Sequence, residues 1–113
     1  MENKTYIFYV AGMKFHRYPW VKPFIKEGDK VLLIPDPDNK YDPHAVKIIY
    51  PRGNKFIMLG HVPMKKDLSR KIAKHLEDMI TDDPLAKIGT VYLHAPNAPS
   101  YQALKVEVSF NVS

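Results

Sequence analysis

The sequence predicts a mainly β domain with helical additions: a small, partly closed barrel of about six strands, with one main helix between the fourth and fifth strands. Three observations indicate this fold. Short runs rich in β-branched and aromatic residues recur along the chain, one stretch alone has helical periodicity, and no linker divides the sequence. A chain of 113 residues is long enough for one modest core, so we predict a single domain over residues 1–113.

The first four strands are predicted in the N-terminal half. TYIFYVAG (residues 5–12) is aromatic and β-branched, and a long, proline-punctuated excursion follows it. EGDKVLLI leads into a second strand, and AVKIIY (residues 45–50) forms a third, with Val46 and Ile48 on one face and Lys47 on the other. PRGNK is predicted to turn the chain into a fourth strand, FIMLGHV (residues 56–62).

A helix and two further strands complete the prediction. Apolar residues recur at three- and four-residue steps after Pro63 and give one helical stripe of Leu68, Ile72, Leu76, Met79 and Ile80. Proline at the first turn suits a helix start, and Pro84 is expected to end the helix, which plugs one end of the barrel. KIGTVYLH and LKVEVSFNV read as strands. The second alternates, with the inward residues Leu104, Val106, Val108, Phe110 and Val112.

Composition limits the partners and the compartment. The chain has no cysteine, which excludes disulfides and thiolate metal sites and favours a reducing compartment. Its apolar runs are too short to span a bilayer, and the N-terminal residues lack the pattern of a signal peptide. We therefore expect a cytoplasmic protein with no membrane partner.

The net charge of +5 is modest, but its distribution is informative. The segment KFHRYPWVKPFIK, from Lys14 to Lys26, interleaves cations with aromatic rings and contains no acid. Single-stranded nucleic acid is bound by such a combination, because cations neutralise the backbone and rings stack on bases. The composition fits equally well a solvated loop whose rings enter the core.

Catalytic patterns are sparse. The histidines show no close metal-ligand spacing, and no glycine-rich phosphate loop or nucleophile motif is found. Asp36, Asp38 and Asp42 suggest a calcium loop, but Lys40, Tyr41 and Lys47 occupy positions where such a loop needs an oxygen ligand, a glycine and a glutamate. We expect a protein that is not an enzyme and that uses no metal or other cofactor.

Three segments in order carry a family resemblance. AGMKFH after the first strand, then GDKVLLIPDPDNKYDPHAVKI, then LGHVP before the helix resemble the HIRAN domain, and the similarity spans residues 6–112. The resemblance implies an OB-like β-barrel with helical additions. It also implies a nucleic-acid-binding module of DNA repair or replication, since the best-studied members bind single-stranded DNA and recognise its 3′-hydroxyl end.

The resemblance also implies the site residues. Asn39, Tyr41 and Asp42 match the N-x-Y-D motif that lines the end-binding pocket in those members. Lys14, Phe15 and His16 fall where helicase-linked members carry an arginine and two aromatics, with histidine here in place of the second ring. The remaining matched candidates are His61, which follows a glycine, Lys65 or Lys66 as a phosphate ligand, and Tyr101 on the last loop. Pro63 and Met64 are an insertion relative to those members, and the segment around Trp20 has no counterpart in them. The charge pattern adds Arg17 to the phosphate contacts.

The acidic loop gives the site a possible selectivity. A carboxylate repels phosphate but accepts a hydrogen bond from a hydroxyl, so Asp42 would favour a terminal sugar over a continuing strand. The alternative is that Asp42 only forms an Asx turn with local backbone and that Tyr41 is a core residue. Asp36, Asp38 and His44 are expected to have local structural roles only.

A second function class stays open. The domain would then be a protein-interaction or adaptor module without direct DNA binding, whose partner supplies a helicase or nuclease activity.

Overall fold

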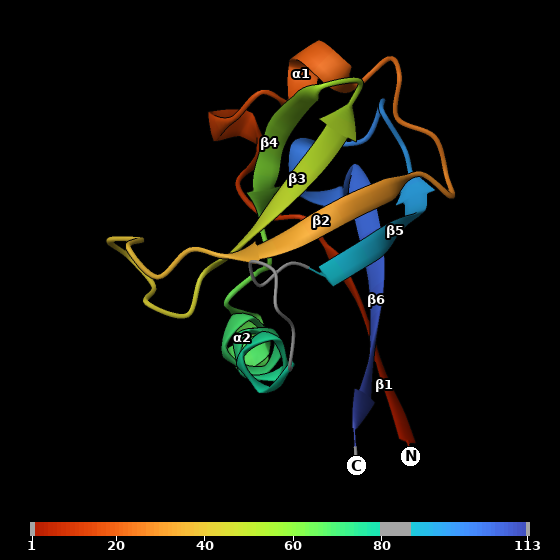
Figure 1. The fold of residues 1–113 in the computed structure, drawn as a ribbon. Coiled ribbons are helices and arrows are strands. Elements are labelled where there is room, and N and C mark those ends of the chain that lie inside the picture. The colour runs from red at the N-terminus through yellow and green to blue at the C-terminus, as the bar shows by residue number, and fades with distance from the viewer. Residues whose placement is uncertain (1, 80–86, 113) are drawn as a thin grey trace.

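The structure is a computed structural model that describes residues 2–79 and 87–112. The strands are β1 (Glu2–Tyr9), β2 (Lys30–Pro35), β3 (Val46–Arg52), β4 (Lys55–His61), β5 (Lys87–His94) and β6 (Leu104–Val112). The helices are α1 (Tyr18–Val21), α2 (Leu68–Asp78) and the short 3₁₀ turns η1 (Met13–Phe15), η2 (Lys65–Asp67) and η3 (Ser100–Gln102). The six strands form one antiparallel sheet in the order β1-β6-β5-β2-β3-β4 (Figure 1). The prediction of a mainly β domain with one main helix is confirmed.

The two edges of this sheet meet, which closes the barrel in part. Ala11, just beyond β1, and His61, the last residue of β4, form a β-bridge with N–H to O=C distances of 2.8 and 2.9 Å in the two directions. Gly60 makes this approach possible, because a Cβ atom there would lie 2.2 Å from the carbonyl oxygen of Ala11. Among the described residues, one β-bridge thus joins the two edges of the sheet, and the barrel is partly closed as predicted.

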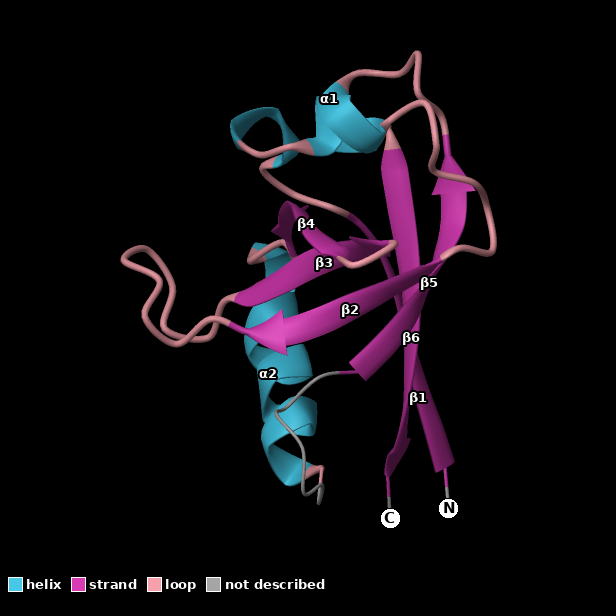
Figure 2. Ribbon diagram, turned by 45° about the horizontal axis from the view of Figure 1, so that its top comes forward, coloured by secondary structure: helices cyan, strands magenta, loops and turns pink. Residues whose placement is uncertain are grey.

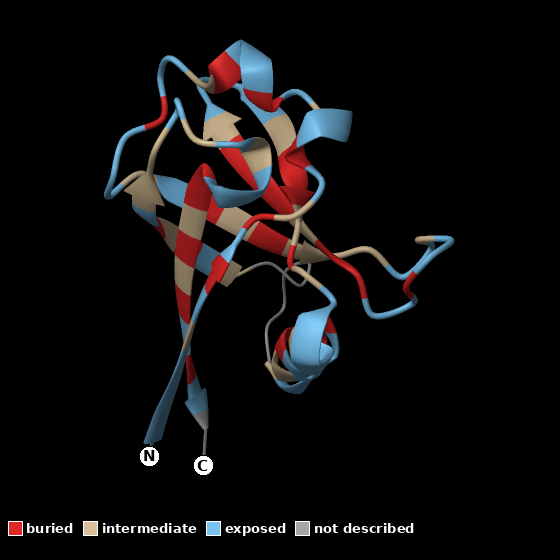
Figure 3. Ribbon diagram, turned by 180° about the vertical axis from the view of Figure 1, so that it is seen from behind, coloured by how far each residue is buried: buried red, intermediate tan, exposed pale blue. Residues whose placement is uncertain are grey.

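The core lies inside the curved sheet and extends to α2 (Figure 3). Alternate residues of β6 point inward, and the predicted inward residues Leu104, Val106, Val108 and Phe110 are all buried; the side chain of Val112 lies outside the described part. Ile72 and Leu76 of α2 pack into the same core beside β3, and Figure 2 shows α2 alongside the sheet.

The predicted bounds of α2 were wrong. Lys66 and Asp67 have left-handed backbone angles, with φ of 56° and 59°, so the regular helix begins at Leu68 and not near Pro63. It ends at Asp78, because Met79 is extended with ψ of 127°. Ile80 and Pro84, which were expected to belong to the apolar stripe and to end the helix, lie outside the described residues.

The bounds of the first strand also differ from the prediction. β1 runs from Glu2 to Tyr9, earlier than expected, because it pairs with β6 over that whole length. β2 begins at Lys30, after the turn in which Gly28 has φ of 91°, and contains the predicted apolar run. The sequence reveals the apolar residues of a strand. It does not reveal polar residues that are extended because they pair with a neighbouring strand.

The segment between β1 and β2 is folded, although the sequence predicted only an excursion. Tyr18 and Val21 of α1 are buried, and the hydroxyl of Tyr18 lies 2.9 Å from Nε2 of His94 on β5. Nδ1 of that histidine lies 3.0 Å from the carbonyl oxygen of Ile25. A carbonyl oxygen can only accept, so Nδ1 donates and Nε2 accepts from the tyrosine. This chain of hydrogen bonds fixes the basic, aromatic segment on the barrel.

Candidate nucleic-acid interface

A groove of about 890 Å³ lies where the barrel closes. Three segments line it: the chain after β1, the loop between β2 and β3, and the chain after β4. We call it the Asp42 groove. Its lining residues are Ala11, Gly12, Phe15, His16, Asn39, Tyr41, Asp42, Ala45, His61, Val62, Pro63, Met64 and Lys65. The groove therefore brings together Phe15, His16, Asn39, Tyr41, Asp42, His61 and Lys65 of the predicted site residues.

The loop between β2 and β3 is held by its own polar side chains. Oδ1 of Asn39 accepts hydrogen bonds from the backbone N–H groups of Tyr41 at 2.9 Å and Asp42 at 3.1 Å. The backbone N–H of Asp36 donates to the carbonyl of Ala45 at 2.8 Å and closes the base of the loop. Asparagine is suited to this position, because its side chain satisfies backbone donors that a turn leaves unpaired.

The Asp42 carboxylate is buried, with 8% of the residue exposed. Oδ1 accepts the backbone N–H of His44 at 2.9 Å, which is the Asx turn of the alternative interpretation. Oδ2 accepts the hydroxyl of Ser69, a buried residue of α2, at 2.8 Å. An ionised carboxylate offers about four acceptor sites, so two accepted bonds leave capacity for another hydroxyl donor. Asp42 is thus a turn residue and also a wall of the groove.

Asp36 orients two groove residues, so the expectation that its role is only local was wrong. Its Oδ2 lies 3.3 Å from Nδ2 of Asn39 and 3.3 Å from Nε2 of His61. Burial acts to raise the pKa of this carboxyl, but the hydrogen bonds from His61 and Asn39, with the nearby Lys47, outweigh it, and the pKa lies below its usual value. The side chain therefore stays ionised and sets the position of both partners.

Two histidines stand together in the groove. The ring centroids of His16 and His61 are 5.6 Å apart. Burial and the neighbouring His61 lower the pKa of His16 below its usual value of 6.5. A phosphate placed beside this ring would oppose both effects, because it stabilises the protonated form.

The aromatic rings of the groove are turned to solvent. Tyr41 is 88% exposed and Phe15 is 75% exposed, so the interpretation of Tyr41 as a core residue is wrong. Rings exposed to this extent can stack on a base.

The remaining candidates lie around this groove. Of the two lysines after β4, Lys65 lines the groove and Lys66 does not. Nζ of Lys14 lies 5.0 Å from the centroid of the Phe15 ring. Tyr101 is exposed on η3, which packs against η1, the turn that carries Phe15. Lys14, Lys66 and Tyr101 are thus not among the residues that line the groove.

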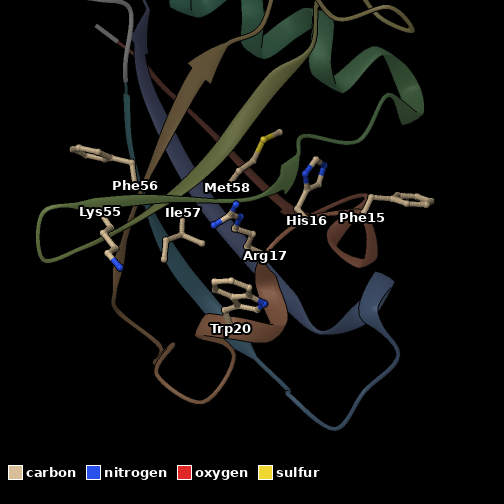
Figure 4. Close-up of a pocket in the computed structure, with 8 residues that line it drawn as sticks. All are labelled: Phe15, His16, Arg17, Trp20, Lys55, Phe56, Ile57 and Met58. Carbon is tan, nitrogen blue, oxygen red and sulfur yellow. The ribbon is translucent and has the colours of Figure 1, made fainter.

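Arg17 belongs to a second groove of about 700 Å³, shown in Figure 4. We call it the Trp20 groove, and its lining residues are Phe15, His16, Arg17, Trp20, Lys55, Phe56, Ile57 and Met58. Sequence reasoning had not singled out Lys55 or Phe56. The only sequence signal for them is a cation and an aromatic ring directly after a hairpin turn, which alone does not indicate a site.

Within residues 2–79 and 87–112, no group of three or more histidine, aspartate or glutamate side chains could hold a metal ion. No helix in this part of the chain is long and apolar enough to cross a membrane.

Fold and groove define a class of protein. It is a small, partly closed β-barrel with an aromatic and basic groove, containing one buried acid, at the place where the two sheet edges meet. The chain belongs to the HIRAN domain family, whose model matches residues 4–112. HIRAN domains are known as nucleic-acid-binding modules.

Two solved structures share the fold. The crystal structure of the HIRAN domain of human HLTF superposes with a TM-score of 0.65 at 22% identity, covering 94% of this chain and 74% of that chain. A protein from Lactobacillus plantarum has a TM-score of 0.61 at 13% identity, covering 97% of this chain and 100% of the other. Among curated proteins no match is found.

Proposed function

We propose that the domain binds single-stranded DNA and prefers strands that end in a 3′-hydroxyl, with the terminal nucleotide in the Asp42 groove. The observation that carries the proposal is the convergence of three distant segments on this groove. They supply exposed rings, partly buried histidines and a lysine around a single carboxylate. This combination suits one nucleotide with its phosphate on one side and a free hydroxyl on the other.

Asp42 provides the selectivity for an end. Its carboxylate is fixed by His44 and Ser69 and cannot turn away to avoid an incoming anion. A terminal 3′-hydroxyl donates to it, whereas a 3′-phosphate, or the phosphodiester of a continuing strand, brings negative charge against it.

The rest of the groove binds the nucleotide itself. Phe15 and Tyr41 offer faces for the base or the sugar, while His16, His61 and Lys65 meet the phosphate on its 5′ side. Lys14, Arg17, Lys66 and Tyr101 add charge and a ring at the border. None of these roles requires bond-breaking chemistry, so we propose a binding module rather than an enzyme.

The proposal places the domain in the cytoplasm, in DNA repair or replication, beside a helicase or nuclease that acts on the bound end. The absence of cysteine supports a reducing compartment. An adaptor that binds only proteins is the alternative. It predicts no affinity for DNA and no steep salt dependence.

The test is a fluorescence titration with one short DNA sequence in three forms: ending in a 3′-hydroxyl, ending in a 3′-phosphate, and closed into a circle. We expect the tightest binding for the hydroxyl end and similar, weaker binding for the other two. Equal affinity for all three forms would leave a nonspecific single-strand binder and contradict end recognition.

A further inference from the structure

The Trp20 groove continues the Asp42 groove. Phe15 and His16 line both, so the two grooves meet along η1 without a change of element. The Trp20 groove lies between α1, which carries Trp20, and β4, which carries Lys55 to Met58 (Figure 4).

The Trp20 groove resembles the Asp42 groove in its cations and rings but has no acidic residue among the described ones that line it. Arg17 and Lys55 supply positive charge, and three rings are largely exposed: Phe15 at 75%, Trp20 at 69% and Phe56 at 69%. None of the described residues that line it is acidic, whereas the Asp42 groove contains a carboxylate. The Trp20 groove therefore lacks the group that would repel an internal phosphodiester.

The backbone that carries Trp20 is held in place. The guanidinium carbon of Arg17 lies 5.0 Å from the centroid of the ring. The backbone N–H of Arg17 donates to the carbonyl of Met58 on β4 at 3.2 Å, and the backbone N–H of Trp20 donates to the carbonyl of Arg17 at 3.0 Å. Tyr18 and Val21 on either side are buried. The backbone at Trp20 is therefore ordered before binding, so no backbone ordering is needed to present the ring.

We propose that the Trp20 groove binds the internal nucleotides that precede the 3′-terminal nucleotide of the same strand. Bases stack on Trp20, and Arg17 and Lys55 contact the phosphates. The inference rests on the proposed function, because it takes the Asp42 groove as the place of the 3′ end. It deepens that function, since the recognised unit becomes a 3′-terminal segment and not one nucleotide.

The protein carries its own reporter for this binding. Trp20 is the one tryptophan in the chain, so the intrinsic tryptophan fluorescence reports on this groove alone. The experiment titrates the whole chain with 3′-hydroxyl DNA strands of about two to about ten nucleotides, a range that covers the span of one barrel of this kind. Affinity is measured independently, by competition with a dye-labelled strand.

We expect the shortest strand to bind without changing the tryptophan signal, and longer strands to bind more tightly and quench it. Trp20→Ala should weaken the binding of a long strand about tenfold to a hundredfold and leave the shortest strand unaffected. Trp20→Phe, which keeps a ring, should restore most of the affinity. Since Trp20 is largely exposed, both variants should keep the melting temperature of the parent.

A charge variant tests the same groove by salt dependence. Lys55→Gln should lower the log–log salt slope for a long strand by about 0.7 and not change it for the shortest strand. Lys30→Gln, which removes an exposed lysine outside both grooves, is the matched control and should change neither slope.

The outcomes separate the two proposals. If strands of every length bind equally well and none quenches Trp20, end recognition stands and the Trp20 groove is left for another occupant, such as a protein segment; this overturns the inference. If long strands quench Trp20 and bind with the same affinity whether they end in a hydroxyl or a phosphate, the groove binds nucleic acid and end recognition fails. If no strand binds at any length, both proposals fail.

Discussion

The hydroxyl of Ser69, in the first turn of α2, donates a 2.8 Å hydrogen bond to Oδ2 of Asp42, on the loop between β2 and β3. Both residues are buried. Together with the backbone N–H of His44, which donates to Oδ1, this bond determines how the carboxylate is presented. The orientation of the proposed hydroxyl acceptor therefore depends on a residue of the helix.

Ser69→Ala should lower the free energy of unfolding by about 1–3 kcal/mol, because it leaves a buried carboxylate without one of its donors. Urea denaturation measures this change. Ser109→Ala is the control: that hydroxyl bonds Thr5 on an exposed surface, and its loss should cost less than about 0.5 kcal/mol. Equal effects of the two substitutions would show that the Asp42–Ser69 bond adds no stability.

Asp42→Asn should narrow the preference for a 3′-hydroxyl over a 3′-phosphate end, because it removes the charge and keeps the size and one acceptor oxygen. Binding to the phosphate end should improve. The measurement is the ratio of the two affinities, with the melting temperature as a check on the loop. Asp38→Asn, at an exposed position outside the groove, should leave the ratio unchanged. Asp36→Asn is unsuitable as a control, because Asp36 holds Asn39 and His61.

Phe15→Ala should weaken single-strand binding by about 1–3 kcal/mol if the ring stacks on a base. The melting temperature should stay near that of the parent, since the ring is 75% exposed. Tyr92→Ala, which removes an exposed ring on β5 away from both grooves, should affect neither quantity. A destabilised Phe15→Ala protein that binds normally would exclude Phe15 from the site.

Binding should strengthen as the pH falls from about 7 to about 5. The pKa of His16 is lowered from 6.5 by burial and by His61, and a bound phosphate raises it, so binding is coupled to proton uptake. The stability of the free domain should instead decrease as the pH falls. The unfolded chain binds this proton at a higher pH than the folded chain does, so the free energy of unfolding decreases as the pH falls below 6.5. Affinities across this pH range, with His16→Gln as the comparison, test the assignment. A variant that keeps the full pH dependence would refute it.

Gly60→Ala should destabilise the domain by about 1–3 kcal/mol or more, because the added methyl group meets backbone and cannot be accommodated by a side-chain rotation. It would lie 2.2 Å from the carbonyl oxygen of Ala11. Gly53→Asn serves as the control, since nothing lies within 4 Å of an added Cβ there and asparagine tolerates its φ of 61°. Similar denaturation curves for the two variants would show that the contact between Gly60 and Ala11 accommodates a methyl group at little cost in stability.

The sequence predicted most of the fold, because strands and helices leave a periodic pattern. The alternation of β6 and the apolar stripe of α2 are such patterns, and both face the core as expected. α1 was missed, because four residues are too few to show a period. The start of α2 was misplaced, because nothing in the sequence reveals that Lys66 and Asp67 adopt left-handed angles.

Part of the site could be predicted for a different reason. Asn39, Tyr41 and Asp42 lie in one motif, so a resemblance finds them together. The role of Asp36 depends on His61, which is 25 residues away in sequence and is brought near only by the folded sheet. The Trp20 groove likewise joins α1 to β4. Contacts of this kind depend on tertiary structure and leave no local pattern.

The β-bridge between Ala11 and His61 couples local unfolding of the barrel to ligand binding. Both residues line the Asp42 groove, and each supplies backbone atoms to the single bridge that joins the sheet edges. Transient opening of the bridge separates the two sides of the groove, so the open form cannot bind. A bound strand end that touches both sides then favours the closed form by mass action. The occupied domain should therefore fluctuate less where Ala11 and His61 pair than the empty one does.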